Sequence, residues 1–344
     1  MNFVGKHILS VAQLSRSDVE QIFSVADKMI PYAQRQRITR VLAGAILSNL
    51  FFEASTRTRL SFGAAFNLLG GNVLETTGLA SSSLVKGESL QDFARVISGY
   101  SDVIVMRHPD AGSVAEFAES SRSPVLNGGD GSNEHPTQAL LDLYTIEKEL
   151  NYRRKSLDGL RIAVVGDLKY GRAVHSLLKL LKVFHNITVH MVSPPDLRAP
   201  ERVIAELQEA GHEVRDFDQL ELGIQAVDVL YVTRTQEERF SSAAEAIKYK
   251  GLFRINQAVY TQHCEPNTVI MHPLPRDSRE TAQELSEDLD SNPNLAVFRQ
   301  TDNGLLIRMA LFALILDVVD KIEFHSAPVA WRADPKKWEQ PPFD

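Results

Sequence analysis

The sequence predicts an α/β fold with two parallel-sheet domains linked by interdomain helices. Apolar runs typical of buried strands alternate with segments of helical periodicity along the chain, and this order favours parallel sheets covered by helices. The length of 344 residues suits two domains of ordinary size better than one core. A polar, turn-rich segment, NYRRKSLDG at residues 151–159, separates two such alternating series.

Each series has its own expected elements. In the first we expect strands at residues 43–52, 72–76, 102–106 and 124–127, and helices at 58–69, 88–99, 113–121 and 136–150. In the second we expect strands at 160–167, 187–193, 227–233 and 267–271, and helices at 172–184, 200–210 and 280–288. The segment LLIRMALFALILDVV, residues 305–319, predicts a helix too apolar to lie on a surface.

Composition excludes several classes of function. The chain has 37 Lys and Arg against 44 Asp and Glu, a formal net charge of -7, so we expect no general affinity for nucleic acid or an anionic membrane. Its one cysteine, Cys264, allows neither an internal disulfide nor a cysteine zinc cluster. Without an evident signal peptide or an apolar run of 18 residues, a cytoplasmic protein without a membrane span is expected.

A turn dense in hydroxyl and guanidinium groups follows the first long apolar run. The segment FFEASTRTRLSF, residues 51–62, places Ser55, Thr56, Arg57 and Thr58 between a predicted strand and a helix start. Free backbone N–H groups there attract anions, and a guanidinium fork suits phosphate. A simple helix cap with solvated arginines is the alternative. Two arginines and three hydroxyls within five residues favour a phosphate site instead.

Further polar groups of the first series fall at strand ends or in loops, where α/β proteins bind ligands. VIVMRHP ends a strand at Arg107, and HPTQ places His135 and Gln138 at a helix start. A histidine there tends to stay neutral and can donate to a carbonyl. SSSLVKGESLQDF offers Ser83 and Lys86 to an anion. An exposed arginine, a capping histidine and an ordinary surface loop are the competing interpretations.

The polar groups of the second series favour a carboxylate ligand. Arg172 follows GDLKYG at a helix start, and Arg234 and Gln236 follow a strand in YVTRTQEER. The strand predicted at residues 160–167 is not followed by the G-x-G-x-x-G fingerprint of dinucleotide-binding sites. MHPLPR, residues 271–276, predicts a proline-locked turn whose carbonyls point beyond the sheet.

Together, these groups suit a phosphate and a carbonyl in the first half of the chain and carboxylates in the second. No nucleophile–base pair is evident, and the histidines lack metal-binding spacing. The pattern therefore predicts a transferase that uses positioning and electrostatic stabilisation, with no metal and no cofactor.

In their order, these motifs resemble those of the carbamoyltransferase family, and within it the catalytic chains that use aspartate. The matching set, spread over residues 5–320, is STRTR, KGES, MRHP, HPTQ, GDLKYGR, TRTQ and HPLP. The resemblance implies a carbamoyl-phosphate-binding domain at 1–150, an aspartate-binding domain at 151–302, a helix at 303–320 returning to the first domain, and an extension at 321–344. It also implies a homotrimer with shared active sites, and leaves open a regulatory chain in a larger dodecamer.

The resemblance also implies site residues, motif by motif. The implied catalytic residues are Arg57, Thr58, Arg107 and His135. The implied carbamoyl-phosphate contacts are Ser55, Thr56, Arg57, Thr58, Ser83, Lys86, Arg107, His135, Gln138, Leu274 and Pro275. The implied aspartate contacts are Lys86, Arg172, Arg234, Gln236 and Leu274. Ser83 and Lys86 would reach a neighbouring subunit's site, and Glu53 would steady the arginines when the domains close.

The implied reaction is attack of the L-aspartate amine on carbamoyl phosphate, an early step of de novo pyrimidine biosynthesis that gives N-carbamoyl-L-aspartate and phosphate. Transfer to ornithine is the close alternative. Relatives that use ornithine tend to carry an HCLP turn, whereas HPLP stands here, and Arg172 and Arg234 favour a substrate with two carboxylates. A non-catalytic scaffold of the same family would predict losses among the anchor residues, and none is seen.

Overall fold

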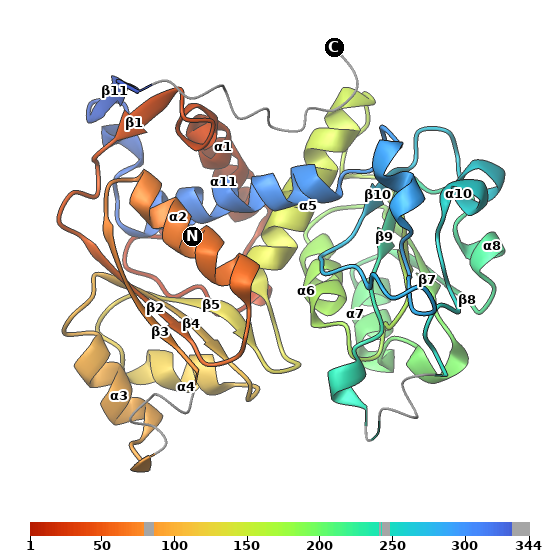
Figure 1. Ribbon diagram of the computed structural model, residues 1–344, viewed down its shortest axis with the longest axis horizontal. Coiled ribbons are helices and arrows are strands. Elements are labelled where there is room, and N and C mark those ends of the chain that lie inside the picture. The colour runs from red at the N-terminus through yellow and green to blue at the C-terminus, as the bar shows by residue number, and fades with distance from the viewer. Residues whose placement is uncertain (79–85, 241, 243–247, 332–344) are drawn as a thin grey trace. The chain divides into compact units, whose positions relative to one another are not determined.

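The computed structural model describes residues 1–78, 86–240, 242 and 248–331, which form two compact units (Figure 1). One unit comprises Met1–Leu141 with the described residues from Asp302 on, and the other comprises Asp142–Thr301. The division falls inside helix α5 (Pro136–Tyr152), whereas the sequence predicts a boundary in the polar segment at residues 151–159. Each unit contains its own parallel sheet, so the predicted α/β fold class is confirmed.

The first unit is built on a four-stranded parallel sheet of order β3-β2-β4-β5. Its strands are β2 (Ile46–Phe51), β3 (Asn72–Thr77), β4 (Val103–His108) and β5 (Val125–Asp130). β4 and β5 are buried along their whole length, as expected for strands covered on both faces. Ile8 of the N-terminal segment bridges to Leu126 in parallel and so covers the β5 edge.

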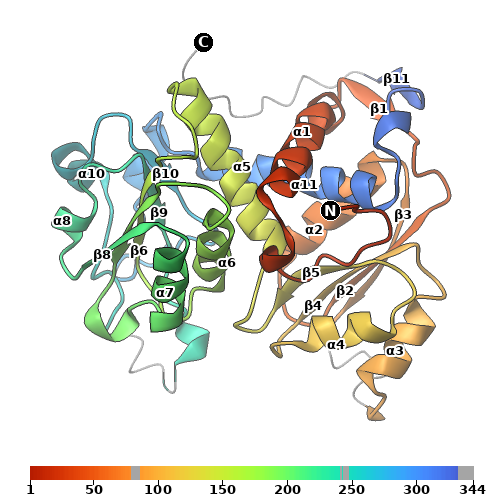
Figure 2. The same ribbon diagram turned by 180° about the vertical axis from the view of Figure 1, so that it is seen from behind.

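Helices cover both faces of this sheet. Figures 1 and 2 show α3 (Leu90–Ile97) and α4 (Ser113–Ser120) on one face, and α1 (Arg16–Ala33) and α2 (Thr56–Leu68) on the other. The apolar helix α11 (Val297–Ile315) packs on α2, where the rings of Phe66 and Phe312 lie 5.0 Å apart. Phe312 is fully buried, which confirms that this helix does not lie on a surface.

The second unit has a five-stranded parallel sheet of order β10-β9-β6-β7-β8. Its strands are β6 (Arg161–Val165), β7 (Thr188–Val192), β8 (Glu213–Phe217), β9 (Val229–Val232) and β10 (Val269–Met271). In both views α6 (Arg172–Leu181) and α7 (Glu201–Glu209) lie on one face, and α8 (Leu220–Gly223) and α10 (Gln257–His263) lie on the other. Within the described ranges, no helix is long and apolar enough to cross a membrane.

Several elements of the fold differ from the sequence prediction, among them a helix that does not form and a strand pair that was not expected. The predicted helix at 280–288 is wrong, because Leu285 forms a parallel bridge with Ile255 and a 3-10 helix starts only at Glu287. A small antiparallel pair, β1 (Arg37–Thr39) with β11 (Ser326–Pro328), was not anticipated. It joins the N-terminal segment of the first unit to its C-terminal segment.

Gly166 lets the turn after β6 approach the end of β9. Its φ is +119°, and a Cβ atom would lie 2.1 Å from the Thr233 carbonyl oxygen. We expect Gly166→Ala to lower the free energy of unfolding by about 2–6 kcal/mol, because unfavourable φ and overpacking each cost about 1–3 kcal/mol. Urea unfolding followed by circular dichroism measures this loss. The control is Gly211→Ala, which shares a positive φ without a close contact; equal losses would contradict the packing argument.

Candidate functional site

The predicted phosphate turn lies at the carboxyl end of β2, in the first unit. β2 ends at Phe51, and the 13-residue helix α2 begins at Thr56 with Ser55 as its N-cap. The Ser55 hydroxyl makes no capping hydrogen bond, so a simple cap does not account for this residue. Thr58 is buried, whereas Thr56 and Arg57 are exposed. The turn thus places hydroxyls and a guanidinium at the positive end of a helix.

Arg107 is placed beside this turn by the sheet. β2 and β4 are neighbours, and Phe51 pairs with Arg107 in their parallel register. The arginine is 7% exposed; its Nη2 lies 2.7 Å from a carboxylate oxygen of Glu53, and its Nη1 donates to the Gly128 carbonyl at 3.2 Å. These two contacts hold the guanidinium in one orientation. The competing interpretation of an exposed arginine at a strand end is therefore wrong.

The side chains of His135 and Arg107 both lie next to Gly129. A Cβ atom on Gly129 would lie 2.8 Å from Arg107 Nη1 and 3.5 Å from His135 Cδ2. His135 is buried and immediately precedes α5, and the half-buried Gln138 donates its backbone N–H to the His135 carbonyl at 3.0 Å. The structure therefore brings two predicted polarising groups together, with Gln138 in the next helical turn.

The loop between β5 and α5 is held by residues that the sequence analysis missed. Asp130 is 1% exposed and accepts hydrogen bonds from the Asn127 side chain at 2.9 Å and from the Glu134 N–H at 3.1 Å. Glu134 in turn accepts from the Ser10 hydroxyl at 2.8 Å. The run N-G-G-D-G was a signal for this tight turn, but the partner from the N-terminal segment lies 124 positions away.

The loop predicted to carry Ser83 and Lys86 is described only from Lys86 on. Ser83 lies outside the described residues. Lys86 is exposed ahead of α3, whose start is capped by the Ser89 hydroxyl. The lysine is thus open to a ligand or to a second subunit.

Asp167 organises the predicted carboxylate site of the second unit. It is 1% exposed, and it accepts from the Tyr170 N–H at 3.0 Å and from the Gln236 N–H at 2.9 Å. The first bond shapes the turn before Arg172, the first residue of α6, and the second joins the segment after β9 to the turn after β6. Arg234 Nη1 donates to the carbonyl of the next residue at 3.0 Å. The three predicted side chains thus belong to two neighbouring strand ends.

The predicted proline-locked turn follows β10 at the same sheet edge. The Leu274–Pro275 peptide is cis, and Leu274 has a φ of +55°. The Leu274 N–H donates to His272 Nδ1 at 2.8 Å, and His272 Nε2 lies 2.8 Å from a Glu284 carboxylate oxygen. Burial lowers the pKa of His272, although the Glu284 carboxylate acts in the opposite direction. A neutral, fully buried histidine therefore stands directly behind the turn.

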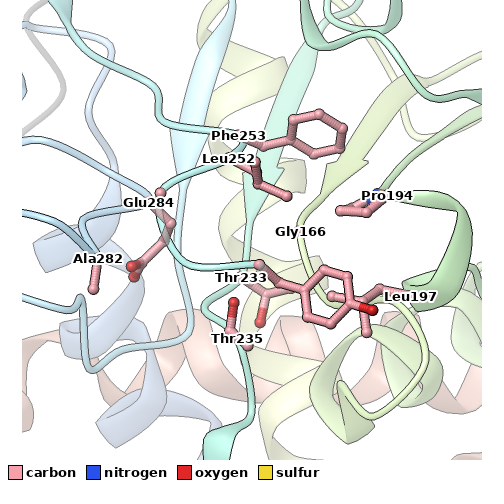
Figure 3. A pocket seen from close by; sticks show the side chains of 11 residues that line it. Gly166, Pro194, Leu197, Thr233, Thr235, Leu252, Phe253, Ala282 and Glu284 are labelled. Carbon is pink, nitrogen blue, oxygen red and sulfur yellow. The ribbon is translucent and has the colours of Figure 1, made fainter. Parts of the chain in front are cut away.

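A hollow opens at this edge of the second unit (Figure 3). It has about 320 Å³ of open space. Figure 3 shows apolar surface from Pro194 and oxygen atoms from Thr235 and Glu284. The predicted aspartate contacts do not line the hollow itself, but Arg234 lies in sequence between two lining residues, Thr233 and Thr235. The hollow is thus an indentation beside the predicted carboxylate site.

In the described part of the chain, neither a metal centre nor a reactive thiol is indicated. Among the residues that the structure describes, no group of three or more His, Cys, Asp and Glu side chains is arranged to hold a metal ion. Cys264 is half-buried at the C-cap of α10, and burial raises the pKa of its thiol to about 12. Such a thiol carries too little thiolate to act as a nucleophile near neutral pH.

We expect iodoacetamide to label Cys264 of the native protein at pH 8 about a thousandfold more slowly than in the unfolded chain. The reason is that the thiolate fraction falls with the rise of pKa above its ordinary value near 8.5. Mass spectrometry of samples labelled in buffer and in guanidinium chloride measures the two rates. Equal rates would mean that the thiol is accessible and reactive in the folded protein.

Two family models match the chain. The model described as the aspartate/ornithine carbamoyltransferase carbamoyl-P binding domain matches residues 6–148. The model described as the aspartate/ornithine carbamoyltransferase Asp/Orn binding domain matches residues 158–315.

Known proteins match it over nearly its full length. It is 65% identical over 331 residues to the aspartate carbamoyltransferase catalytic subunit of Cellvibrio japonicus, across 96% of this chain and 98% of that one. It is 66% identical to the subunit of the same name from Saccharophagus degradans, with the same coverage.

Solved structures agree with these matches. Aspartate transcarbamoylase from Trypanosoma cruzi in complex with N-(phosphonacetyl)-L-aspartic acid is 40% identical, with a TM-score of 0.83 over 91% of this chain and 97% of that one. The catalytic subunit of M. Jannaschii aspartate transcarbamoylase is 43% identical, with a TM-score of 0.81 over 91% and 98% of the two chains.

Proposed function

Because the chain belongs to the aspartate/ornithine carbamoyltransferase family, we propose that it transfers the carbamoyl group of carbamoyl phosphate to the amine of L-aspartate. The products are N-carbamoyl-L-aspartate and phosphate, which places the enzyme early in pyrimidine biosynthesis. One observation carries the proposal for the donor substrate. Arg107 and His135 both lie next to the Cβ position of Gly129, and Arg107 pairs in the sheet with Phe51, just before the hydroxyl- and arginine-rich turn that starts α2.

The first unit supplies the groups that suit the donor. In the proposed reaction, the amine nitrogen attacks the carbamoyl carbon, the carbon–oxygen bond to phosphate breaks, and the amine proton leaves to a phosphate oxygen. Thr58, Arg107 and His135 donate to the carbonyl oxygen as negative charge builds on it. Arg57 and the backbone of the α2 start neutralise the departing phosphate. This scheme needs no protein base.

The second unit supplies the groups that suit the acceptor. Arg172 and Arg234 provide one guanidinium for each carboxylate of L-aspartate, with Gln236 and the Leu274–Pro275 turn completing the contacts. The names of both bacterial relatives support aspartate over ornithine. The HPLP turn, in place of HCLP, favours the same acceptor. A non-catalytic scaffold is disfavoured because every described anchor residue is present.

We propose further that the enzyme is a homotrimer whose subunits share active sites through Ser83 and Lys86, and that it is cytoplasmic. The exposure of Lys86 supports its use by a second subunit. The impaired Lys86→Ala and Arg107→Ala chains should regain activity when they are unfolded, mixed and refolded together, because some sites would then receive both intact residues. If the mixture is no more active than the two variants alone, each chain acts alone. Mass measurement of the native assembly would also reveal a regulatory chain.

The experiment that tests the proposed substrates uses N-(phosphonacetyl)-L-aspartate, which joins the features of both. At 100 times its Kd, it should stabilise the folded protein by about 2.7 kcal/mol and raise the Tm accordingly. The corresponding phosphonacetyl derivative of L-ornithine is the matched control and should raise the Tm less, because it keeps the phosphonate group but lacks the second carboxylate. A larger shift with the ornithine derivative would reverse the choice of acceptor.

A further inference from the structure

The HPLP turn is held from behind by one buried histidine, to which the family resemblance assigns no role. The His272 ring touches both the turn and an acidic residue. Its Nδ1 accepts the Leu274 N–H at 2.8 Å, and its Nε2 lies 2.8 Å from Glu284 Oε1. Since Nδ1 is an acceptor, the proton of the neutral ring lies on Nε2, which faces the Glu284 carboxylate without the alignment of a hydrogen bond. The ring therefore touches both neighbours, and its well-formed hydrogen bond is the one that Nδ1 accepts from Leu274.

Glu284 holds the other end of the same turn. Its carboxylate oxygens accept the Asp277 N–H at 3.1 and 3.3 Å. His272 thus holds the Leu274 N–H at the start of the turn, and Glu284 holds the Asp277 N–H at its end. Leu274 has a φ of +55°, which is unfavourable for a leucine, so its backbone needs a partner to keep this conformation.

A second set of buried contacts fixes the histidine itself. The backbone N–H of His272 donates to Gln300 Oε1 at 3.0 Å, and Gln300 Nε2 donates to Asp142 Oδ1 at 2.6 Å. Tyr231 donates its hydroxyl to the other oxygen of Asp142 at 2.7 Å. All of these side chains are at most 1% exposed. The network therefore runs from β9 and α5 to the turn without a solvated link.

We propose that His272 is a positioning residue of the acceptor site: through Leu274 and Glu284 it fixes the backbone carbonyls of the Leu274–Pro275 turn toward the substrate. This inference rests on the proposed function, because it assigns the turn to L-aspartate binding. In this proposal His272 itself does not touch the substrate and acts only through the turn. Loss of the Nδ1 acceptor should loosen the turn and weaken acceptor binding, whereas loss of the Nε2 donor should matter less.

Two substitutions separate the ring nitrogens. The amide oxygen of His272→Asn can occupy the place of Nδ1 and accept the Leu274 N–H. The longer amide of His272→Gln reaches toward Glu284 but leaves the Leu274 N–H without its acceptor. His190→Gln is the matched control, since His190 is a buried histidine of the same unit with a ring–carbonyl hydrogen bond of 2.7 Å to Gly223. All three variants are expected to lose some stability.

The experiment measures hydrogen exchange of the peptide that spans residues 272–278, together with kcat and both KM values. For His272→Gln we expect faster exchange in that peptide and about a tenfold rise in KM for L-aspartate, the effect of one buried donor left unpaired. His272→Asn should recover most of both losses. His190→Gln should leave the exchange of this peptide and both KM values as in the wild type.

Three results would overturn the inference. These are unchanged exchange in His272→Gln, faster exchange with an unchanged KM for L-aspartate, and equal effects of His272→Gln and His190→Gln. Failure of the proposed function looks different, because the wild-type protein would then show no transfer. The exchange measurement would still report, without any substrate, whether His272 holds the turn.

Discussion

Replacement of Arg107 by alanine is expected to lower kcat for carbamoyl transfer by about 10²–10³-fold, the usual effect of removing one preorganised donor to a developing negative charge. Arg107 is 7% exposed and is held by Glu53 at 2.7 Å and by the Gly128 carbonyl at 3.2 Å. Its orientation is therefore set before substrate binds. Steady-state kinetics with each substrate varied in turn measure the loss.

Two further variants show whether the position of the charge matters. Arg107→Lys keeps the charge but not the fork that contacts Glu53 and Gly128 together, and we expect it to stay closer to the alanine variant than to the wild type. Arg95→Ala removes an exposed arginine of α3 that pairs with Asp92 at 3.6 Å on the surface, a contact worth about 0–1 kcal/mol. Equal losses in Arg95→Ala and Arg107→Ala would contradict the assignment.

Replacement of Arg234 by alanine is expected to raise KM for L-aspartate about 10- to 150-fold, because a hydrogen bond to a charged group contributes about 1.5–3 kcal/mol. The guanidinium is tied to the carbonyl of the following residue at 3.0 Å. In the proposed reaction it faces a carboxylate of the acceptor. Initial rates over a range of L-aspartate concentrations, at saturating carbamoyl phosphate, give the value.

The same experiment contains its own control. KM for carbamoyl phosphate should change little in Arg234→Ala, since the donor is assigned to groups of the first unit. Arg215→Ala removes an exposed arginine of β8 that pairs with Glu213 at 2.7 Å, and both KM values should stay as in the wild type. A rise confined to the KM for carbamoyl phosphate would mean that Arg234 serves the donor.

Local patterns predicted the buried part of the fold well. β4 and β6 are apolar runs, and their positions agree with the prediction. The edge strand β8, Glu213–Phe217, was not predicted because three of its five residues are charged and exposed, which leaves no apolar run. Helix α1 was also missed, although Ser15 and Asp18 form a capping box at its start. This capping pattern is a local signal of a helix start in the sequence.

Long-range contacts were beyond local reasoning. The expected helix at 280–288 has helix-forming residues, but Leu285 is drawn into a bridge with Ile255 and is 1% exposed. Tertiary pairing thus overrode local propensity. The pairing of β1 with β11 likewise joins Arg37 to Pro328, and no periodicity could have revealed it.

In the candidate site too, local patterns could be predicted and long-range contacts could not. That ligand groups gather at carboxyl ends of parallel strands is a general rule, so the positions of Arg107 and Arg234 could be predicted from the sequence. The residues that hold these site loops in place could not be predicted. Asp130 and Asp167 act through partners that are distant in sequence or belong to the backbone. The contact between His272 and Glu284 depends on the irregular segment that replaced the predicted helix.

The most direct test of the proposed function is carbamoyl transfer by the purified wild-type chain, with L-aspartate and L-ornithine as parallel acceptors. Release of phosphate and formation of the carbamoylated amino acid are measured together. We expect N-carbamoyl-L-aspartate and phosphate in equal amounts, and no product from L-ornithine. Product from L-ornithine, or no product from either acceptor with a folded protein, would contradict the assignment.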